Sequence, residues 1–304
     1  GQNINAGRPE SRRDPICCSM RSREGAAMPI TIVDSQVHIW GENTPERPWP
    51  KQDAENLAQR ARAFQLADLQ AEMRAAGVDR AVIVPPTWEG LRNDLALDAA
   101  HRYPDRFAVM GRIAVTDPQA PEYFASWKQQ PAIKGVRLGF HTTALKPLLT
   151  EGKADWLFAA AEKAAMPAMV LIPGDMAAFR AIAERHQGLK LIVDHMGIPR
   201  GGKGDAAFTH IDPLCALARL PNVSVKLTSA PSYALDPYPH RGLHPYLRRL
   251  YDSFGPKRLY WGSDLTRMPC SYALCVRMFT EEMRWLTGED LEWIMGRAIC
   301  ELIG

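Results

Sequence analysis

Short runs of apolar, often β-branched residues alternate with longer amphipathic stretches from residue 30 onward. Such runs between polar segments are typical of buried strands, whereas apolar residues about three or four positions apart predict helices that bury one face. We predict eight strands, at Ile30–Gln36, Arg80–Pro85, Phe107–Ile113, Ile133–Phe140, Ala168–Ile172, Lys190–His195, Val223–Leu227 and Arg258–Gly262. The predicted helices lie at Leu66–Ala76, Leu91–Tyr103, Glu122–Gln129, Asp155–Ala165, Met176–Arg185, Ile211–Ala218, Pro245–Phe254 and Met283–Cys300.

This strict alternation of strand and helix predicts parallel strand pairing and an α/β fold, the (β/α)8 TIM barrel. A doubly wound open sheet is the main alternative, but it usually has a glycine-rich turn after its first strand, and the segment Asp34–His38 contains no glycine. Because no low-complexity linker divides the chain, we expect a single barrel domain over residues 28–304. The polar segment Gly1–Ala27 lacks the apolar core of a signal peptide, and we interpret it as a disordered leader or a cloning remnant.

Composition excludes several classes of protein. The 304 residues are 46% hydrophobic and 23% charged, as in an ordinary globular protein. The net charge of +3 is too small for a nucleic-acid binder that works by broad phosphate neutralisation. No apolar run approaches the roughly eighteen residues of a membrane-spanning helix. The six cysteines form no CxxC pair, and we expect a cytoplasmic protein with reduced thiols. We also expect a small-molecule substrate. A homo-oligomer is possible.

Polar residues are concentrated at the predicted carboxyl ends of the strands. In a TIM barrel these ends meet at one face, and the active site is built there. Residues scattered at random would fall at both strand ends. The candidates from this placement are Gln36 and His38, Arg112, Arg137, Asp194 and His195, Lys226, and Ser263 and Asp264.

Three of these strand ends resemble the amidohydrolase superfamily: Asp34-Ser35-Gln36-Val37-His38, Val193-Asp194-His195-Met196-Gly197 and Trp261-Gly262-Ser263-Asp264. The resemblance is closest to the branch of small amidohydrolase-related proteins that includes 2-pyrone-4,6-dicarboxylate lactonase, sulfomuconolactone hydrolase and sugar lactonases. It covers roughly Ile30 to Ile303 in the same order of elements. It implies a TIM barrel that hydrolyses a small substrate.

The resemblance also raises the question of a metal. In the family, a His-x-His motif on strand one binds a divalent ion together with histidines on strands five and six and an aspartate on strand eight. Here Gln36 replaces the first histidine and strand five has none, and glutamine is a poor ligand for zinc. The lactonase branch includes members that need no metal, so we expect no tightly bound metal. The alternative is one zinc or manganese ion at His38, His195 and Asp264, with water as a further ligand.

Asp264 is the strongest catalytic candidate, because a carboxylate at the barrel mouth can take a proton from an attacking water. Its alternative role is a helix N-cap, for which aspartate is favoured. His195 and His38, with Gln36, would polarise the substrate carbonyl, although each histidine could instead be a buried structural residue. Strand alternation predicts that Asp194, next to His195, points away from the site.

Three basic strand ends suggest an anion-binding pocket, since guanidinium groups grip carboxylates in bidentate fashion. These are Arg112, Arg137 and Lys226. Each of them could equally well form a structural salt bridge. Alternation within its glycine-flanked strand predicts that Arg137 faces the barrel interior. Tyr233, in the loop after strand seven, is a further candidate for substrate binding.

The sequence therefore predicts a hydrolase that opens a small carboxylated lactone with water activated by Asp264. A metal-dependent amidohydrolase or decarboxylase of the same superfamily is one alternative. A catalytically inactive barrel that only binds its ligand is the other, because the family's histidines are incomplete.

Overall fold

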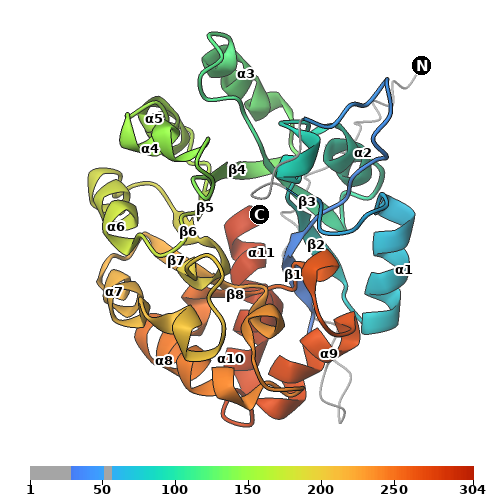
Figure 1. The fold of residues 1–304 in the computed structure, drawn as a ribbon, viewed down its shortest axis with the longest axis vertical. Coiled ribbons are helices and arrows are strands. Elements are labelled where there is room, and N and C mark those ends of the chain that lie inside the picture. Colours follow the sequence, from blue (N-terminus) through green and yellow to red (C-terminus); the bar gives the residue numbers. More distant parts are fainter. Residues whose placement is uncertain (1–28, 51–56) are drawn as a thin grey trace, which may run out of the picture.

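The computed structural model describes residues 29–50 and 57–304, and the predicted leader Gly1–Ala27 lies outside this part of the chain. Eight parallel strands form one sheet in the sequential order β1 to β8, and helices surround it (Figure 1). This confirms the predicted (β/α)8 TIM barrel. The strands are β1 (Val33–Val37), β2 (Arg80–Ile83), β3 (Phe107–Gly111), β4 (Ile133–Gly139), β5 (Ala168–Leu171), β6 (Leu191–Val193), β7 (Val223–Leu227) and β8 (Leu259–Trp261).

The helices follow the strands around the barrel. In the part of the chain that the structure describes, no helix is both long and apolar enough to cross a membrane. The α-helices are α1 (Leu66–Ala76), α2 (Asp94–Arg102), α3 (Ala120–Ser126), α4 (Lys146–Thr150), α5 (Asp155–Lys163), α6 (Met176–Arg185), α7 (Ile211–Ala216), α8 (His244–Phe254), α9 (Tyr272–Arg277), α10 (Gly288–Glu292) and α11 (Ala298–Ile303).

The carboxyl-terminal helices differ most from the sequence prediction. The helix predicted at Met283–Cys300 begins only at Gly288, because Thr287 is extended and Gly288 has a left-handed φ of 58°. From there α10, a π-helical turn at Trp293–Arg297 and α11 follow without a break. The short helices α4 and α9 were not predicted, since five or six residues are too few to establish a helical period.

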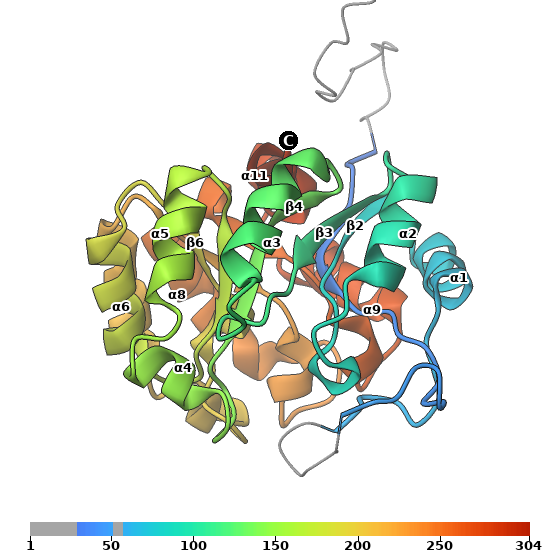
Figure 2. The ribbon, with the colours of Figure 1, turned by 90° about the horizontal axis from the view of Figure 1, so that it is seen from above.

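Two apolar layers hold the barrel together. The larger lies between the strands and the surrounding helices. The smaller fills the barrel interior and is covered by α11, which lies at the end of the barrel opposite α4 (Figure 2). At the other end the interior is polar, and the site lies there. The interior layer consists of Val33, Val82, Val84, Ala108, Met110, Met169, Ile192 and Tyr260 from the strand regions and Trp293, Ala298, Ile299 and Ile303 from the carboxyl-terminal helices.

A β-bulge in β1 turns its polar residues toward the interior. Between Asp34 and Val37, β1 has one residue more than the segment of β2 with which it pairs. Val33 therefore packs inside the barrel while Val37 packs against the helices, although strict alternation would place both on one face. Beyond the bulge, the side chains of Gln36 and His38 line the interior at the barrel mouth.

Buried hydrogen bonds join β8 to β1. The backbone N–H of Asp264 donates to the carbonyl of Gln36 at 2.9 Å. The Asp34 carboxylate accepts from the backbone N–H and hydroxyl of Ser263 and, at 2.7 Å, from the hydroxyl of Tyr272. Burial raises the pKa of Asp34 in spite of these bonds. The motifs at the ends of strands one and eight thus hold each other in place.

Candidate active site

A cavity of about 400 Å³ opens at the carboxyl ends of the strands. Seven of the eight predicted site residues line it, and Lys226 does not belong to its described lining. Among the described lining residues, one is acidic and five are cationic. The predicted residues in the lining are Gln36, His38, Arg112, Arg137, His195, Tyr233 and Asp264.

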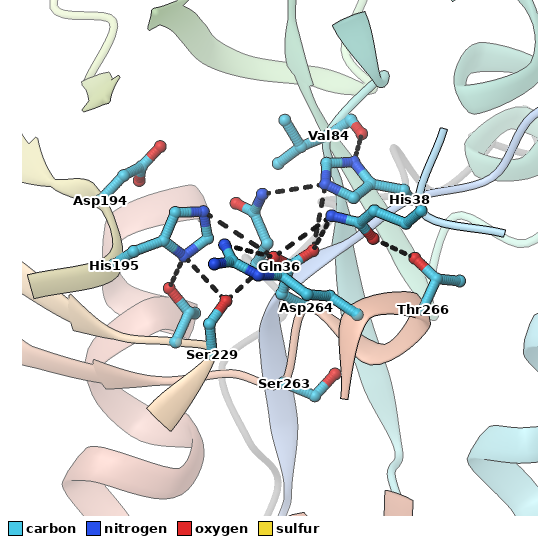
Figure 3. A network of polar contacts seen from close by, with 12 residues as sticks. Gln36, His38, Val84, Asp194, His195, Ser229, Ser263, Asp264 and Thr266 are labelled. Atoms are coloured by element: carbon cyan, nitrogen blue, oxygen red, sulfur yellow. Dashed lines mark hydrogen bonds and ion pairs between the residues drawn. The ribbon is translucent and has the colours of Figure 1, made fainter. Parts of the chain in front are cut away.

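Asp264 lies at the centre of the polar network, between the rings of His38 and His195 (Figure 3). One carboxylate oxygen is 3.2 Å from His38 Nε2. The other accepts from the Ser229 hydroxyl at 2.9 Å and is 4.0 Å from His195 Nε2. Asp264 stands at the N-cap position of a 3-10 turn, but its carboxylate makes no capping hydrogen bond within the described residues. The Asp264 side chain lines the cavity instead of capping the turn.

Asp264 is ionised at neutral pH. Burial by itself would raise the pKa of this carboxyl group, but the hydrogen bond from His38 and the charges of His38 and Arg267 outweigh burial. The pKa of Asp264 therefore lies well below its usual value. An ionised carboxylate that faces a cavity can accept a proton from water.

The surroundings of His38 fix which of its ring nitrogens carries a proton. Nδ1 lies 2.6 Å from the carbonyl oxygen of Val84. Since a carbonyl only accepts, Nδ1 donates there and Nε2 faces the cavity. Nε2 lies 3.3 Å from Gln36 Nε2 in addition to its contact with Asp264. It can donate to that carboxylate only when both ring nitrogens carry a proton.

His195 reaches the cavity through a left-handed turn. Its φ is 49°, and its Nδ1 lies 2.6 Å from the Thr228 hydroxyl and 3.2 Å from that of Ser229. Burial lowers the pKa of His195 to about 3, with the cations of Lys226 and Arg137 adding to it and the carboxylates of Asp264 and Asp194 opposing it. The ring is therefore neutral at pH 7 and can serve as a hydrogen-bonding group.

Asp194 points into the barrel, and the prediction that it points away is wrong. Since Ile192 belongs to the interior layer, alternation places Asp194 on the interior face as well. His195 also faces inward only because its left-handed backbone breaks the alternation. The Asp194 carboxylate forms an ion pair with Arg137 and lies 3.1 Å from Lys226 Nζ. Burial would raise the pKa of Asp194, but these two cations lower it below its usual value.

Lys226 lies beneath the cavity floor. Its ammonium group donates to Gln36 Oε1, and it lies 3.1 Å from Asp194 Oδ1 and 3.5 Å from Met169 Sδ. The side chain is fully buried and is not among the described residues that line the cavity, which favours the alternative of a structural ion pair over the predicted role in substrate binding. Burial lowers the pKa of Lys226, and the Asp194 carboxylate opposes that shift.

Arg112 and Arg137 form a buried cationic wall. Arg137 faces the barrel interior, as alternation predicts, and lines the cavity above its ion pair with Asp194. Arg112 donates through Nε to the carbonyl of Pro85. Burial and the neighbouring charge of Arg137 lower the pKa of Arg112 well below its usual value. An anion bound between the two guanidinium groups would offset both effects.

The rim of the cavity adds three cations that were not among the predicted site residues. Arg267 stacks over the ring of Tyr233 at 5.2 Å and is 4.0 Å from an Asp264 oxygen. Arg200 and Lys203 come from the loop after β6. Each donates to a backbone carbonyl at the rim. The described lining of the cavity therefore carries an excess of positive charge.

Other polar side chains of the site also escaped prediction. The Ser229 hydroxyl bridges Asp264 and His195 but gives no sequence signal beyond following β7. Thr228 directly follows β7, and no sequence pattern indicates its contact with His195. Gln59, from the loop after β1, donates to Asp264 at 3.3 Å. Such contacts between distant loops depend on the folded geometry.

The described residues do not fit a divalent metal at the family's position. They contain no group of three or more histidine, cysteine or acidic side chains arranged to hold an ion. The only acceptor that Gln36 could offer, its Oε1, is occupied by the Lys226 ammonium group. That ammonium also contacts Met169 of β5, and its positive charge would repel a second cation there.

The fold and the site define a hydrolase-like barrel, and comparisons with known proteins identify its family. The chain matches the Amidohydrolase family over residues 33–296. It is 30% identical to L-fucono-1,5-lactonase from Burkholderia ambifaria over 245 residues, which are 76% of this chain and 79% of the relative. It is 29% identical to 4-sulfomuconolactone hydrolase from Hydrogenophaga intermedia over 251 residues, covering 78% and 75% of the two chains.

A solved amidohydrolase from Burkholderia multivorans superimposes with a TM-score of 0.73 at 22% identity, covering 90% of this chain and 99% of that one. It has been solved with bound HEPES and with bound zinc. The protein therefore belongs to the amidohydrolase family, an enzyme family, and its resemblance to that family is confirmed.

Proposed function

We propose that this protein hydrolyses a small anionic lactone with water activated by Asp264 and without a divalent metal. One observation carries the proposal: among the described residues that line the cavity, Asp264 is the one carboxylate, it is ionised, and the other charged side chains are cations. The names of the lactonase relatives support ring opening of a cyclic ester. A positive cavity suits a substrate with a carboxylate or a sulfonate.

The low pKa of Asp264 makes it a weak base in the free protein. Its contacts suggest how substrate binding could make it a stronger base. In the free protein, the hydrogen bond from His38 contributes most to the low pKa of this carboxyl group. When a substrate carbonyl takes over the His38 Nε2–H, Asp264 loses that bond and its pKa rises. It then takes a proton from the attacking water as the C–O bond forms.

The carbonyl oxygen that becomes negative during attack needs donors. His38 Nε2 and Gln36 Nε2, which are 3.3 Å apart, can donate to the same oxygen from fixed positions. When the ring C–O bond breaks, the leaving oxygen takes the proton that Asp264 removed from water. The Asp264 carboxylate is then restored, and the product is the ring-opened hydroxy acid.

Lys226 acts in this scheme through Gln36. An ammonium group has only donors, so it must face the amide oxygen of Gln36, and the amide nitrogen is then directed toward His38. A glutamine without this partner could rotate and present its oxygen to the developing negative charge. Lys226 is thus a positioning residue.

Lys226→Met is expected to lower kcat about tenfold or more and to change KM for an anionic lactone by less than about threefold, because the donor pair is disordered while the cavity lining is intact. The matched variant is Gln36→Leu. The double variant should be no slower than Gln36→Leu alone, since the lysine acts through the glutamine. A rise in KM with unchanged kcat in Lys226→Met would mean direct contact with substrate and would contradict this role.

A panel of five- and six-membered lactones tests the proposed function. The panel pairs carboxylated and sulfonated lactones with neutral sugar lactones, and ring opening is followed by acid release. We expect kcat/KM to be at least about tenfold higher for the anionic members. Equal rates on both groups would reject the anionic substrate, and binding without turnover would favour an inactive binding barrel.

A further inference from the structure

Two cysteines lie in contact outside the cavity. Cys270 directly precedes Ser271, the N-cap residue of α9, and Cys275 lies within that helix. Their sulfur atoms are 3.7 Å apart, and both thiols are free. Cys275 is buried, whereas Cys270 is partly exposed and open to a small reagent. Neither cysteine belongs to the described lining of the cavity.

A buried histidine accompanies the pair. His240 is 5% exposed, and its Nδ1 lies 2.9 Å from the carbonyl oxygen of Asp236, so Nδ1 carries the proton. Its Nε2 is buried and has no hydrogen-bond partner among the described residues. His240 contributes to lowering the pKa of Cys270 and so favours its thiolate form.

The charge state of the two thiols is consistent with this arrangement. The hydrogen bond from Cys275 lowers the pKa of Cys270 to about 6, with His240 adding to the effect and burial opposing it. The pKa of Cys275 is raised by the same bond and by burial. The shared hydrogen bond thus favours the thiolate on the partly exposed Cys270 and the thiol on the buried Cys275.

We propose that Cys270 and Cys275 form a redox-active thiol pair that reacts with hydroperoxides. The Cys270 thiolate attacks one peroxide oxygen, the O–O bond breaks, and the departing oxygen takes a proton, which leaves a sulfenic acid on Cys270. The Cys275 sulfur then attacks the Cys270 sulfur, and water leaves with the thiol proton of Cys275. Two thiols are oxidised to one disulfide and one peroxide is reduced to an alcohol and water.

Disulfide formation requires only a small movement of the two sulfur atoms. The sulfur atoms must approach from 3.7 Å to the roughly 2.05 Å of a disulfide bond. Cys270 lies before the first turn of α9, so its backbone is not held by helical hydrogen bonds within that helix. Cys215 offers an internal comparison: it is also partly exposed, but its sulfur contacts only a backbone carbonyl, that of Arg249, at 4.0 Å among the described residues.

The experiment treats the full, pre-reduced chain with hydrogen peroxide at pH 7, alkylates the remaining thiols at intervals, and maps peptides by mass. We expect a disulfide between Cys270 and Cys275 to form at least about tenfold faster than Cys215 is oxidised, and a thiol reductant to reverse it. In Cys275→Ser, a sulfenic acid should accumulate on Cys270 and be trapped by dimedone. His240→Asn should slow the reaction about tenfold by raising the pKa of Cys270.

Two results would overturn the proposal: oxidation of Cys270 no faster than that of Cys215, or conversion of Cys270 to sulfinic acid with no disulfide to Cys275. Because peptide masses are the readout, neither result depends on whether the protein hydrolyses lactones.

Discussion

Asp264→Asn is expected to lower kcat on an anionic lactone by about 10²-fold or more, because the amide keeps the shape of the carboxylate but cannot accept the proton of water. KM should change little, since the cationic side chains that would bind the anion remain. The hydroxyl of Ser229 and the ring of His38 contact this carboxylate, so thermal unfolding should be measured in parallel.

A surface variant provides the control for Asp264→Asn. Asp98 is exposed and, among the described residues, forms an ion pair with Arg102 on the same helix, and Asp98→Asn should leave kcat unchanged. If Asp264→Asn kept its activity but unfolded at a markedly lower temperature, the carboxylate would be structural and the proposed base would be wrong.

Arg137→Met is expected to lower kcat/KM for anionic lactones by about 2–4 kcal/mol relative to neutral ones, because the anionic group of the substrate loses the buried guanidinium that would bind it. The neutral lactone is the internal reference, since any general loss of order around Asp194 would affect both substrates equally. Arg102→Met, at an exposed position of α2, should change neither rate. Equal losses on charged and neutral substrates would contradict recognition of the anion by Arg137.

The barrel itself was predictable from the sequence. The alternation of buried strands with one-sided helices leaves few architectures, and the predicted strands lie within a few residues of the observed ones. The bulge in β1 was not visible, because it depends on the register between β1 and β2. It nevertheless determines that Gln36 and His38 face inward.

The site was predictable only as far as strand ends mark it. His195, Ser229 and Asp264 follow β6, β7 and β8, and all three adopt left-handed φ angles of 49°, 62° and 56°. Strained conformations of non-glycine residues cost on the order of 1–3 kcal/mol each and persist where the surroundings hold them. No residue type at these positions predicts a left-handed φ angle. Strand alternation therefore placed the Asp194 side chain on the wrong face and did not indicate that Ser229 belongs to the site.

Lys226 illustrates a second limit of sequence reasoning. A lysine at a strand end reads equally well as a ligand for substrate or as a structural ion pair. The fold decides between them by bringing Gln36, Asp194 and Met169 from three other strand regions around one ammonium group. Lys226 and Arg137 are both cations at strand ends, but Arg137 lines the cavity whereas Lys226 is not part of its described lining. Their positions in the barrel, and not their residue types, determine this difference.

The most direct test of the central claim is the rate of anionic lactone hydrolysis by protein that has been stripped with a chelator and whose metal content is measured in the same sample. We expect well under one equivalent of zinc or manganese and an unchanged kcat, because Asp264 activates water and Gln36 is held by Lys226 rather than by an ion. Stoichiometric metal whose removal abolishes turnover, and whose return restores it, would contradict the metal-free mechanism.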